Sequence, residues 1–377
     1  MAGKVSGLPL ETKMSGGPAA LATFGMGLGE SILLRFDDGG ETRWGVIDSA
    51  RKRVNGISVN PALEVLKAAG AHPSLVVLTH PHRDHAKGMA DIVLRAGPDA
   101  LVGCVVPLME EEDELAAIVA EDDSVANGIG QTAVAHAAIS TVWRDGRARR
   151  LNVEVEAEPF DCCGWEVTVL HPSRERAIDT GAALREGAEP NLNNVSAALT
   201  FTRGETSFLL AGDGEQEAWD DVKQRLGPGH LRDKNPLKVP HHGSVPALHA
   251  VVVDPSQPSD REQVVTPFPS SGTLPRLEPD AGVDRLVSAG GSLRLTAMPV
   301  AALPKQPDLS VAEARTALQV GVFGDDDLEI PTIALAPDES SFFEEGDRDP
   351  RECWVVLRLA DDGTIDAELG SHALTIS

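Results

Sequence analysis

The most informative segment of this 377-residue chain is Leu75-Val76-Val77-Leu78-Thr79-His80-Pro81-His82-Arg83-Asp84-His85. Four apolar residues typical of a buried strand precede three imidazoles and a carboxylate. His80 and His82 would point apart on a helix, whereas in a loop leaving a strand they can converge. Imidazole suits zinc and its first-row neighbours, and a mixed imidazole and carboxylate set can hold a second ion. The segment therefore predicts a metal site at the end of a strand; the alternative is a surface loop that happens to be rich in His.

Three other apolar segments also end on residues of ligand type. They are residues 44–49 with Asp48, residues 207–213 with Asp213, and residues 237–244 with His241 and His242. Together with His-x-His-x-Asp-His, this order of motifs resembles the metallo-β-lactamase-fold hydrolases. The resemblance covers roughly residues 20–300. It implies an α/β fold, a four-layer αββα sandwich in which two stacked β-sheets are flanked by helices.

A finer resemblance rests on Pro240-His241-His242-Gly243-Ser244 and on the Asn-rich residues 191–196. With residues 210–213, these segments look like the hydrolase domain of the ComEC type, a bacterial competence protein whose domain is implicated in degrading one DNA strand during uptake. Two features depart from that group. His82 stands where Asp is common, and an Asn-rich segment replaces the His that related enzymes place before the bridging Asp. The resemblance implies phosphodiester chemistry without fixing the substrate.

The resemblance also implies a ligand set for two divalent cations, Zn²⁺ or Mn²⁺. One ion would take His80 and His82, the other Asp84, His85 and a His from 241–242, and Asp213 would bridge them. A hydroxide held between the two ions is the expected nucleophile. Asp48 is expected to orient a ligand His or a metal-bound water.

Several assignments within this set stay open. His241 is the preferred ligand of the pair because it directly follows the strand, while His242, Ser244 and Lys238 are expected to contact the scissile phosphate. Asn193 or Asn194 could complete the first site, and an oxygen-rich site would favour manganese. His171 also ends an apolar strand, but a structural role is favoured for it. The expected catalytic residues are Asp84, Asp213, His242, Lys238, Asn193 and Ser244, and the expected metal ligands are His80, His82, Asp84, His85, Asp213 and His241.

Composition sets broad limits on the class of protein. Hydrophobic residues make up 42% of the chain, and its length suffices for a large core. It has no apolar run of about eighteen residues and no secretory signal at its start, so we expect no membrane span. The four cysteines form no Cys-x-x-Cys pair, which favours reduced thiols and a cytoplasmic location.

The net charge of −25 argues against simple nucleic-acid binding, because proteins that bind nucleic-acid phosphates usually present a basic face. The acids cluster, however, and several bases lead into the paired His residues: Lys223, Arg225, Arg232, Lys234 and Lys238. A local basic strip beside the metals could bind a polyanion, although an ordinary solvated face is the preferred interpretation of any single cluster. DNA is expected as the substrate in preference to RNA. The alternatives are a small phosphodiester such as a cyclic nucleotide, a non-phosphate ester, and a non-enzymatic metal-binding scaffold.

The chain is expected to divide into three parts. Residues 1–302 form the hydrolase domain with a helical insertion at about 109–140, and residues 351–377 form a β-hairpin that packs on it. Residues 303–350 are rich in Pro, Asp and Glu and form a flexible acidic segment. This segment could occupy the basic strip and hold activity down until a regulatory protein partner displaces it or a protease cuts it.

Overall fold

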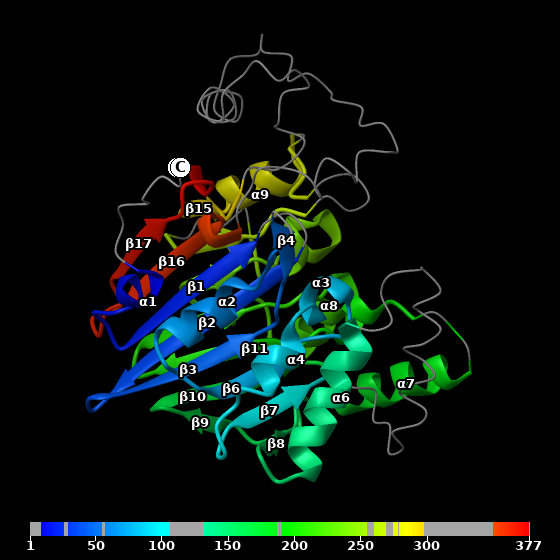
Figure 1. Ribbon diagram of the computed structural model, residues 1–377. Helices are drawn as coiled ribbons and strands as arrows, with labels where there is room; N and C mark the ends of the chain where they lie inside the picture. Colours follow the sequence, from blue (N-terminus) through cyan, green and yellow to red (C-terminus); the bar gives the residue numbers. More distant parts are fainter. Residues whose placement is uncertain are drawn as a thin grey trace.

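Two eight-stranded β-sheets lie face to face at the centre of the chain (Figure 1). The computed structural model describes residues 9–25, 29–54, 57–105, 131–186, 188, 190–254, 260–268, 274–277, 279–297 and 350–376. The first sheet contains, in order, β17 (Ile365–Leu369), β16 (Trp354–Leu359), β1 (Ala19–Gly25), β2 (Glu30–Asp38), β3 (Glu41–Ile47), β6 (Pro73–Leu78), β7 (Leu101–Cys104) and β8 (Arg149–Leu151). The second contains β18 (Leu374–Ile376), β15 (Ser292–Leu295), β14 (Glu262–Val265), β13 (Leu237–Lys238), β12 (Thr206–Leu210), β11 (Ala198–Arg203), β10 (Trp165–His171) and β9 (Phe160–Cys162).

The remaining elements of the described chain are mostly helical. The α-helices are α1 (Leu10–Lys13), α2 (Pro61–Ala68), α3 (Arg83–Ala86), α4 (Met89–Val93), α6 (Gln131–Arg144), α7 (Arg174–Arg185), α8 (Gln216–Leu226) and α9 (Gly282–Ser288). The 3₁₀ turns are η1 (Leu192–Val195), η2 (Pro240–Gly243), η3 (Val245–Ala247) and η5 (Pro350–Glu352). Strands β4 (Lys52–Val54) and β5 (Ile57–Val59) form a separate hairpin. No helix within the described ranges combines the length and the apolar character needed to cross a membrane.

Three apolar clusters separate four layers of structure. Between the sheets, aromatic rings from both sides meet: Phe201 stacks on Phe208 with ring centroids 4.7 Å apart, and Phe36 of the first sheet lies 5.9 Å from Phe201. Helices α2, α4 and α6 cover the outer face of the first sheet, and α8 and α9 cover that of the second. Because each sheet buries both faces, its strands read as nearly continuous apolar runs. The predicted α/β class and four-layer αββα sandwich are confirmed.

Helix α2 shows how local sequence sets these elements. Asn60 accepts a hydrogen bond from the backbone N–H of Leu63 at 3.2 Å, which caps the first turn. Pro61 occupies the first helical position, where its missing N–H costs nothing. Gly70 follows the helix with φ +62°, a left-handed conformation that glycine adopts without strain. Pro61 and Gly70 are thus local signals for the two ends of the helix.

The strand directions bring the ligand-bearing segments together. In the first sheet β3, β6, β7 and β8 run parallel, and in the second β12, β13, β14 and β15 do so. Residues that follow β3, β6, β12 and β13 therefore emerge at the same end of the sandwich. This end carries the candidate site described below.

The C-terminal residues complete both sheets. Strand β16 pairs antiparallel with β1, with Leu21 opposite Leu357, and β17 extends this edge. Strand β18 pairs with β15 at the edge of the second sheet. Of the expected helical insertion at 109–140, the structure describes residues 131–140, which lie in α6, and of the acidic segment 303–350 it describes residue 350. The rest of both segments lies outside the described residues.

We expect His136 on α6 to make the fold sensitive to acid. Its side chain is buried, and burial lowers its pKa to about 4 because the charged form is poorly solvated there. An unfolded His titrates near pH ~6.5, so between about pH 6.5 and 4 the unfolded chain binds a proton that the folded chain does not. Its contribution to stability is therefore complete above about pH 6.5 and declines as the pH falls toward 4. Between pH 7.5 and 5, wild type should lose about 2 kcal/mol more stability than His136→Leu.

Urea unfolding at the two pH values measures this difference. His230→Leu, at an exposed position, serves as the control and should leave the pH dependence of wild type intact. Equal losses in wild type and His136→Leu would show that His136 does not contribute.

Candidate metal centre

The loop that leaves β6 is fixed by Asp48, at the end of β3. One carboxylate oxygen of Asp48 accepts the backbone N–H of Thr79 at 2.7 Å. The other accepts the Thr79 hydroxyl at 2.7 Å and lies 2.7 Å from Nδ1 of His85. All three residues are buried. Asp48 therefore holds the start of the loop and orients the His85 imidazole.

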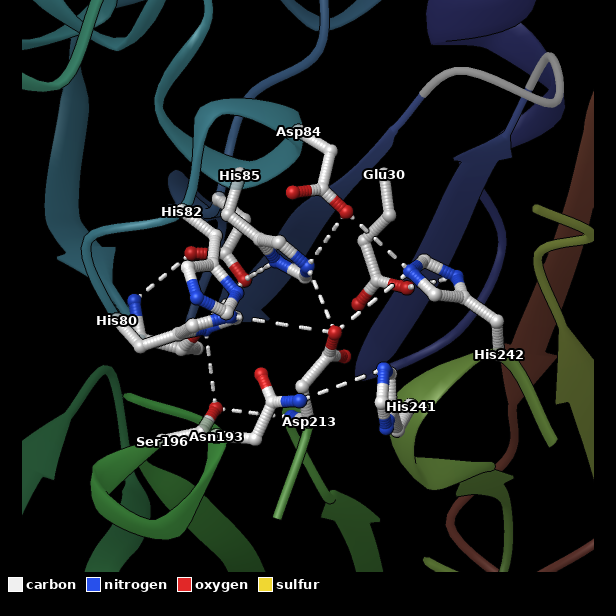
Figure 2. Close-up of polar contacts among 12 residues, drawn as sticks. Glu30, His80, His82, Asp84, His85, Asn193, Ser196, Asp213, His241 and His242 are labelled. Atoms are coloured by element: carbon white, nitrogen blue, oxygen red, sulfur yellow. Dashed lines mark hydrogen bonds and ion pairs between the residues drawn. The ribbon is translucent and has the colours of Figure 1, made fainter. Parts of the chain in front are cut away.

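Four ligand-type side chains from the two sheets converge at this end of the sandwich (Figure 2). One ligand atom each from Asp84, His85, Asp213 and His242 lies within 4.8 Å of the others. The carboxylate of Asp213 lies 3.1 Å from Nε2 of His85 and 3.6 Å from Nε2 of His242. Asp84 lies 3.5 Å from each of the same two nitrogens. Such a set of two imidazoles and two carboxylates can hold a divalent cation.

A second group of imidazoles, His80 and His82, lies next to this cluster, with the ring centroids of His80 and His85 4.3 Å apart. Nε2 of His80 is 4.0 Å from the Asp213 carboxylate and 2.8 Å from Nδ1 of His82. Behind His80, the hydroxyl of Ser196 lies 3.2 Å from Nδ1 and accepts the backbone N–H of Asp213 at 2.8 Å. The Asp213 carboxylate is therefore close both to the His80–His82 pair and to the cluster of Asp84, His85 and His242.

Three of these imidazoles share one arrangement. Nδ1 of His85 is held by Asp48, Nδ1 of His242 lies 2.9 Å from the backbone carbonyl of Thr266, and Nδ1 of His80 lies near two hydroxyls. In each ring Nε2 then faces Asp213. A histidine metal ligand characteristically uses its other ring nitrogen for such an anchoring hydrogen bond.

Unpartnered atoms in the centre provide a test of whether a cation fits. Nε2 of His242, Oδ1 of Asp213 and Oδ1 of Asn193 are buried and have no hydrogen-bond partner among the described residues. Buried polar atoms nearly always have partners, and these three are all metal-ligand types. The residues therefore fit a divalent cation.

The charge states of the centre suit the same role. Burial alone would raise the pKa of Asp213, but His85 and His242 hold that pKa well below its usual range. Burial lowers the pKa of His80 and His82, which favours their neutral forms. Burial acts the same way on His85, but the carboxylates around it raise its pKa well above the usual range, so a cation would have to displace its proton. Ionised carboxylates and neutral imidazoles are the forms that bind metals.

The paired His residues are arranged differently from the prediction. The sequence favoured His241 as the ligand, but His242 is the one that joins the cluster, whereas Nδ1 of His241 lies 2.9 Å from the Glu215 carboxylate. The cause is the backbone, because His241 and His242 have φ of +43° and +53° and do not continue the strand. This turn directs the second ring inward and leaves the first, 21% exposed, at the rim.

Lys238 also lies elsewhere than expected. Its ammonium is buried, 2.6 Å from the carboxylate of Glu30 and 2.8 Å from the carbonyl of Val239. It therefore cannot contact a substrate phosphate, and its predicted role is wrong. Strand β13 directs this side chain into the interface between the two sheets.

The other predicted residues lie around the rim of the centre. Ser244 Oγ is 3.0 Å from Nδ1 of His241, and the amide nitrogen of Asn193 is 3.4 Å from its Nε2. Asn194 donates to Glu217 and so points away from the cluster. His171 donates from Nδ1 to the carbonyl of Ser196 at 2.8 Å, and its buried Nε2 has no hydrogen-bond partner among the described residues.

Sequence reasoning missed three polar residues that touch the centre: Glu30, Thr266 and Glu215. Glu215 follows Asp213 by two positions, and this proximity was a usable signal. Glu30 begins β2 and Thr266 follows β14, and neither carries a local motif. Only the packing of the two sheets brings them to the site.

We expect Asp48→Asn to weaken cation binding by about 10–100-fold, the usual effect of losing a residue that orients a ligand His. The amide retains the size of the carboxylate but provides one acceptor oxygen instead of two for Thr79 and His85. Titration calorimetry with Mn²⁺ measures the affinity. Asp91→Asn, at an exposed Asp paired with Arg51, is the control and should bind as wild type does. Equal affinities in both variants would exclude the orienting role.

Comparisons with known proteins show only distant similarity. No family model and no curated protein matches the chain. Among solved structures, it is similar to a diphosphatase from the PhnP family, at 14% identity over 59% of this chain and 73% of that one, with a TM-score of 0.31. A metallo-β-lactamase of subclass B3, MEM-A1 from a soil metagenome library, has 12% identity, coverage of 59% and 76%, and a TM-score of 0.30. A protein of unknown function from Enterococcus faecalis V583 has 10% identity, coverage of 58% and 49%, and a TM-score of 0.29. Similarity this low leaves the chemistry of the chain to be judged from its own residues.

Proposed function

We propose that the chain is a metal-dependent hydrolase that cleaves phosphodiesters, with DNA, the substrate that its sequence motifs imply, as the first candidate. The observation that carries the proposal is the convergence of His80, His85, Asp84 and His242 on Asp213, with buried ligand atoms left unpartnered. When bound, divalent cations would activate water as a nucleophile and offset the charge that develops on phosphoryl oxygens. No side-chain nucleophile is then required.

The residues of the centre have distinct parts in this proposal. Asp213 holds its ionised carboxylate close to both groups of imidazoles. The exposed rim is formed by Asp84 and His241, whose side chains are 19% and 21% exposed, whereas His85 and His242 are buried. A substrate phosphate would therefore approach from the side of Asp84 and His241. Burial alone would lower the pKa of His241, but Glu215 at Nδ1 raises it, so the protonated ring can donate from Nε2 to a phosphate oxygen.

A small phosphodiester is the second candidate substrate, and the charges favour it. The net charge is −25, and two cations of the expected basic strip bind acids within the fold. Arg225 pairs with Asp221, and Lys238 pairs with Glu30. With two of its cations already paired, the expected basic strip is a weaker site for a long polyanion such as DNA. These charges are better suited to a small substrate that the centre alone would hold.

Turnover assays separate these candidates. The purified chain is incubated with plasmid DNA, linear DNA, a cyclic dinucleotide and bis-p-nitrophenyl phosphate, each with Mn²⁺, Zn²⁺ or chelator. DNA cleavage that requires metal and is absent in Asp213→Asn is the expected result. Turnover of the small diesters alone would favour the second candidate. If no phosphodiester is cleaved with either metal, the proposal fails and an ester substrate or a non-catalytic scaffold takes its place.

A further inference from the structure

Glu30 is a buried carboxylate beside the centre, and one of its oxygens lies within 4.8 Å of ligand-type atoms of Asp48 and His85. It is the first residue of β2 in the first sheet and is 1% exposed. Its Oε2 lies 2.6 Å from the ammonium of Lys238 and accepts the hydroxyl of Thr266 at 2.6 Å. Lys238 lies in β13 of the second sheet, and Thr266 directly follows β14 of the same sheet. Figure 2 shows Glu30 next to His242, on the side away from His80 and His82.

The hydrogen bonds of Thr266 determine which ring nitrogen of His242 carries the proton. The Thr266 hydroxyl donates its single proton to Oε2 of Glu30. The hydroxyl oxygen can then only accept from Nδ1 of His242, which lies 2.9 Å away, and the Thr266 carbonyl at 2.9 Å accepts as well. Nδ1 must therefore carry the proton. Nε2, whose lone pair is left free, faces Asp84 and Asp213.

The same carboxylate joins the two halves of the sandwich. The first motif, with Asp84 and His85, is carried by the first sheet, and Asp213 and His242 follow strands of the second. The distance between these halves fixes the spacing of the ligands. The Glu30–Lys238 ion pair crosses the interface between the two sheets, and both side chains are about 1% exposed. In such surroundings, removing one partner leaves an uncompensated charge, so the pair resists relative movement of the sheets.

We propose that Glu30 is a positioning residue for the metal centre: through Thr266 it sets the orientation of His242, and through Lys238 it fixes the second sheet against the first. This role depends on the proposed function only in that the centre holds divalent cations.

Titration calorimetry with Mn²⁺, combined with urea unfolding, tests the proposal. In Glu30→Gln and in Thr266→Val, Mn²⁺ affinity should fall by about 10–100-fold, as expected when a ligand His loses its orienting partner. The matched control is Glu262→Gln. It breaks a half-buried carboxylate–cation pair between Glu262 and Arg294, which both lie in the second sheet, away from the centre. The control should bind Mn²⁺ as wild type does.

A double variant distinguishes positioning from a merely structural role. Glu30→Met combined with Lys238→Met removes both charges, and apolar replacement of a buried pair is often neutral for stability. We expect this variant to fold and still bind Mn²⁺ about 10–100-fold more weakly, because the Thr266 hydroxyl has lost its acceptor. If Glu30→Gln does not fold, the double variant still tests the proposal. Wild-type affinity in Glu30→Gln or in the double variant would overturn the proposal. Absence of Mn²⁺ binding in wild type would instead refute the proposed function.

Discussion

Asp213→Asn should reduce phosphodiester hydrolysis by at least about 10³-fold at saturating metal concentration. The substitution keeps the size of the side chain and removes its charge. Asp213 lies 3.1 Å from His85, 3.6 Å from His242 and 4.0 Å from His80, so its carboxylate is close to both groups of ligands. Losing it affects every cation that the centre could hold. Initial rates on bis-p-nitrophenyl phosphate and plasmid DNA measure the effect.

A nearby carboxylate provides the control. Asp221 on α8 pairs with Arg225 at the surface, and Asp221→Asn should leave the rate within about twofold, since exposed pairs contribute little. Circular dichroism and urea unfolding verify that both variants are folded. If Asp213→Asn retained a tenth or more of the wild-type rate, Asp213 would not be the shared ligand.

Removing divalent metal should lower the free energy of unfolding by about 4 kcal/mol relative to protein saturated at 1,000 times the dissociation constant. A cation that binds the folded chain alone stabilises it by mass action. The centre gives a structural reason to expect selective binding, because Asp48, Asp84 and Asp213 meet there only after both sheets have formed. Urea unfolding with and without chelator, followed by restoration of Mn²⁺, measures the difference.

Asp213→Asn is also the control for this experiment. Its stability should depend on chelator far less than that of wild type, because its cation affinity is reduced. An equal chelator effect in both proteins would place the stabilising cation outside the centre. No chelator effect in wild type would indicate that the folded chain gains nothing from metal.

The sequence was sufficient for the architecture and for the neighbourhood of the centre. Apolar runs that end on Asp48, His80 and Asp213 predicted strands whose ends would meet, and parallel pairing within the two sheets brings them together. The Pro and Gly that bound α2 specified that helix in the same local way. Periodicity and strand-end chemistry are properties of short segments, and a sequence displays them directly.

Features that depend on backbone conformation or on the joint between the sheets could not be read from the sequence. The choice between His241 and His242 rests on two successive left-handed residues, and no local motif marks that conformation. Lys238 appeared available for phosphate because its partner, Glu30, is more than 200 positions away in the chain and meets it only across the joint. Long-range pairings of this kind are set by the packing of whole sheets.

Crystals grown with Mn²⁺ test the central claim most directly, through anomalous scattering. The account predicts anomalous peaks at coordinating distance from the Asp213 carboxylate, one of them also contacting Asp84, His85 and His242. The same crystals of Asp213→Asn should lose or weaken these peaks. Wild-type crystals that show no manganese beside Asp213, or show it only elsewhere on the molecule, would contradict the account.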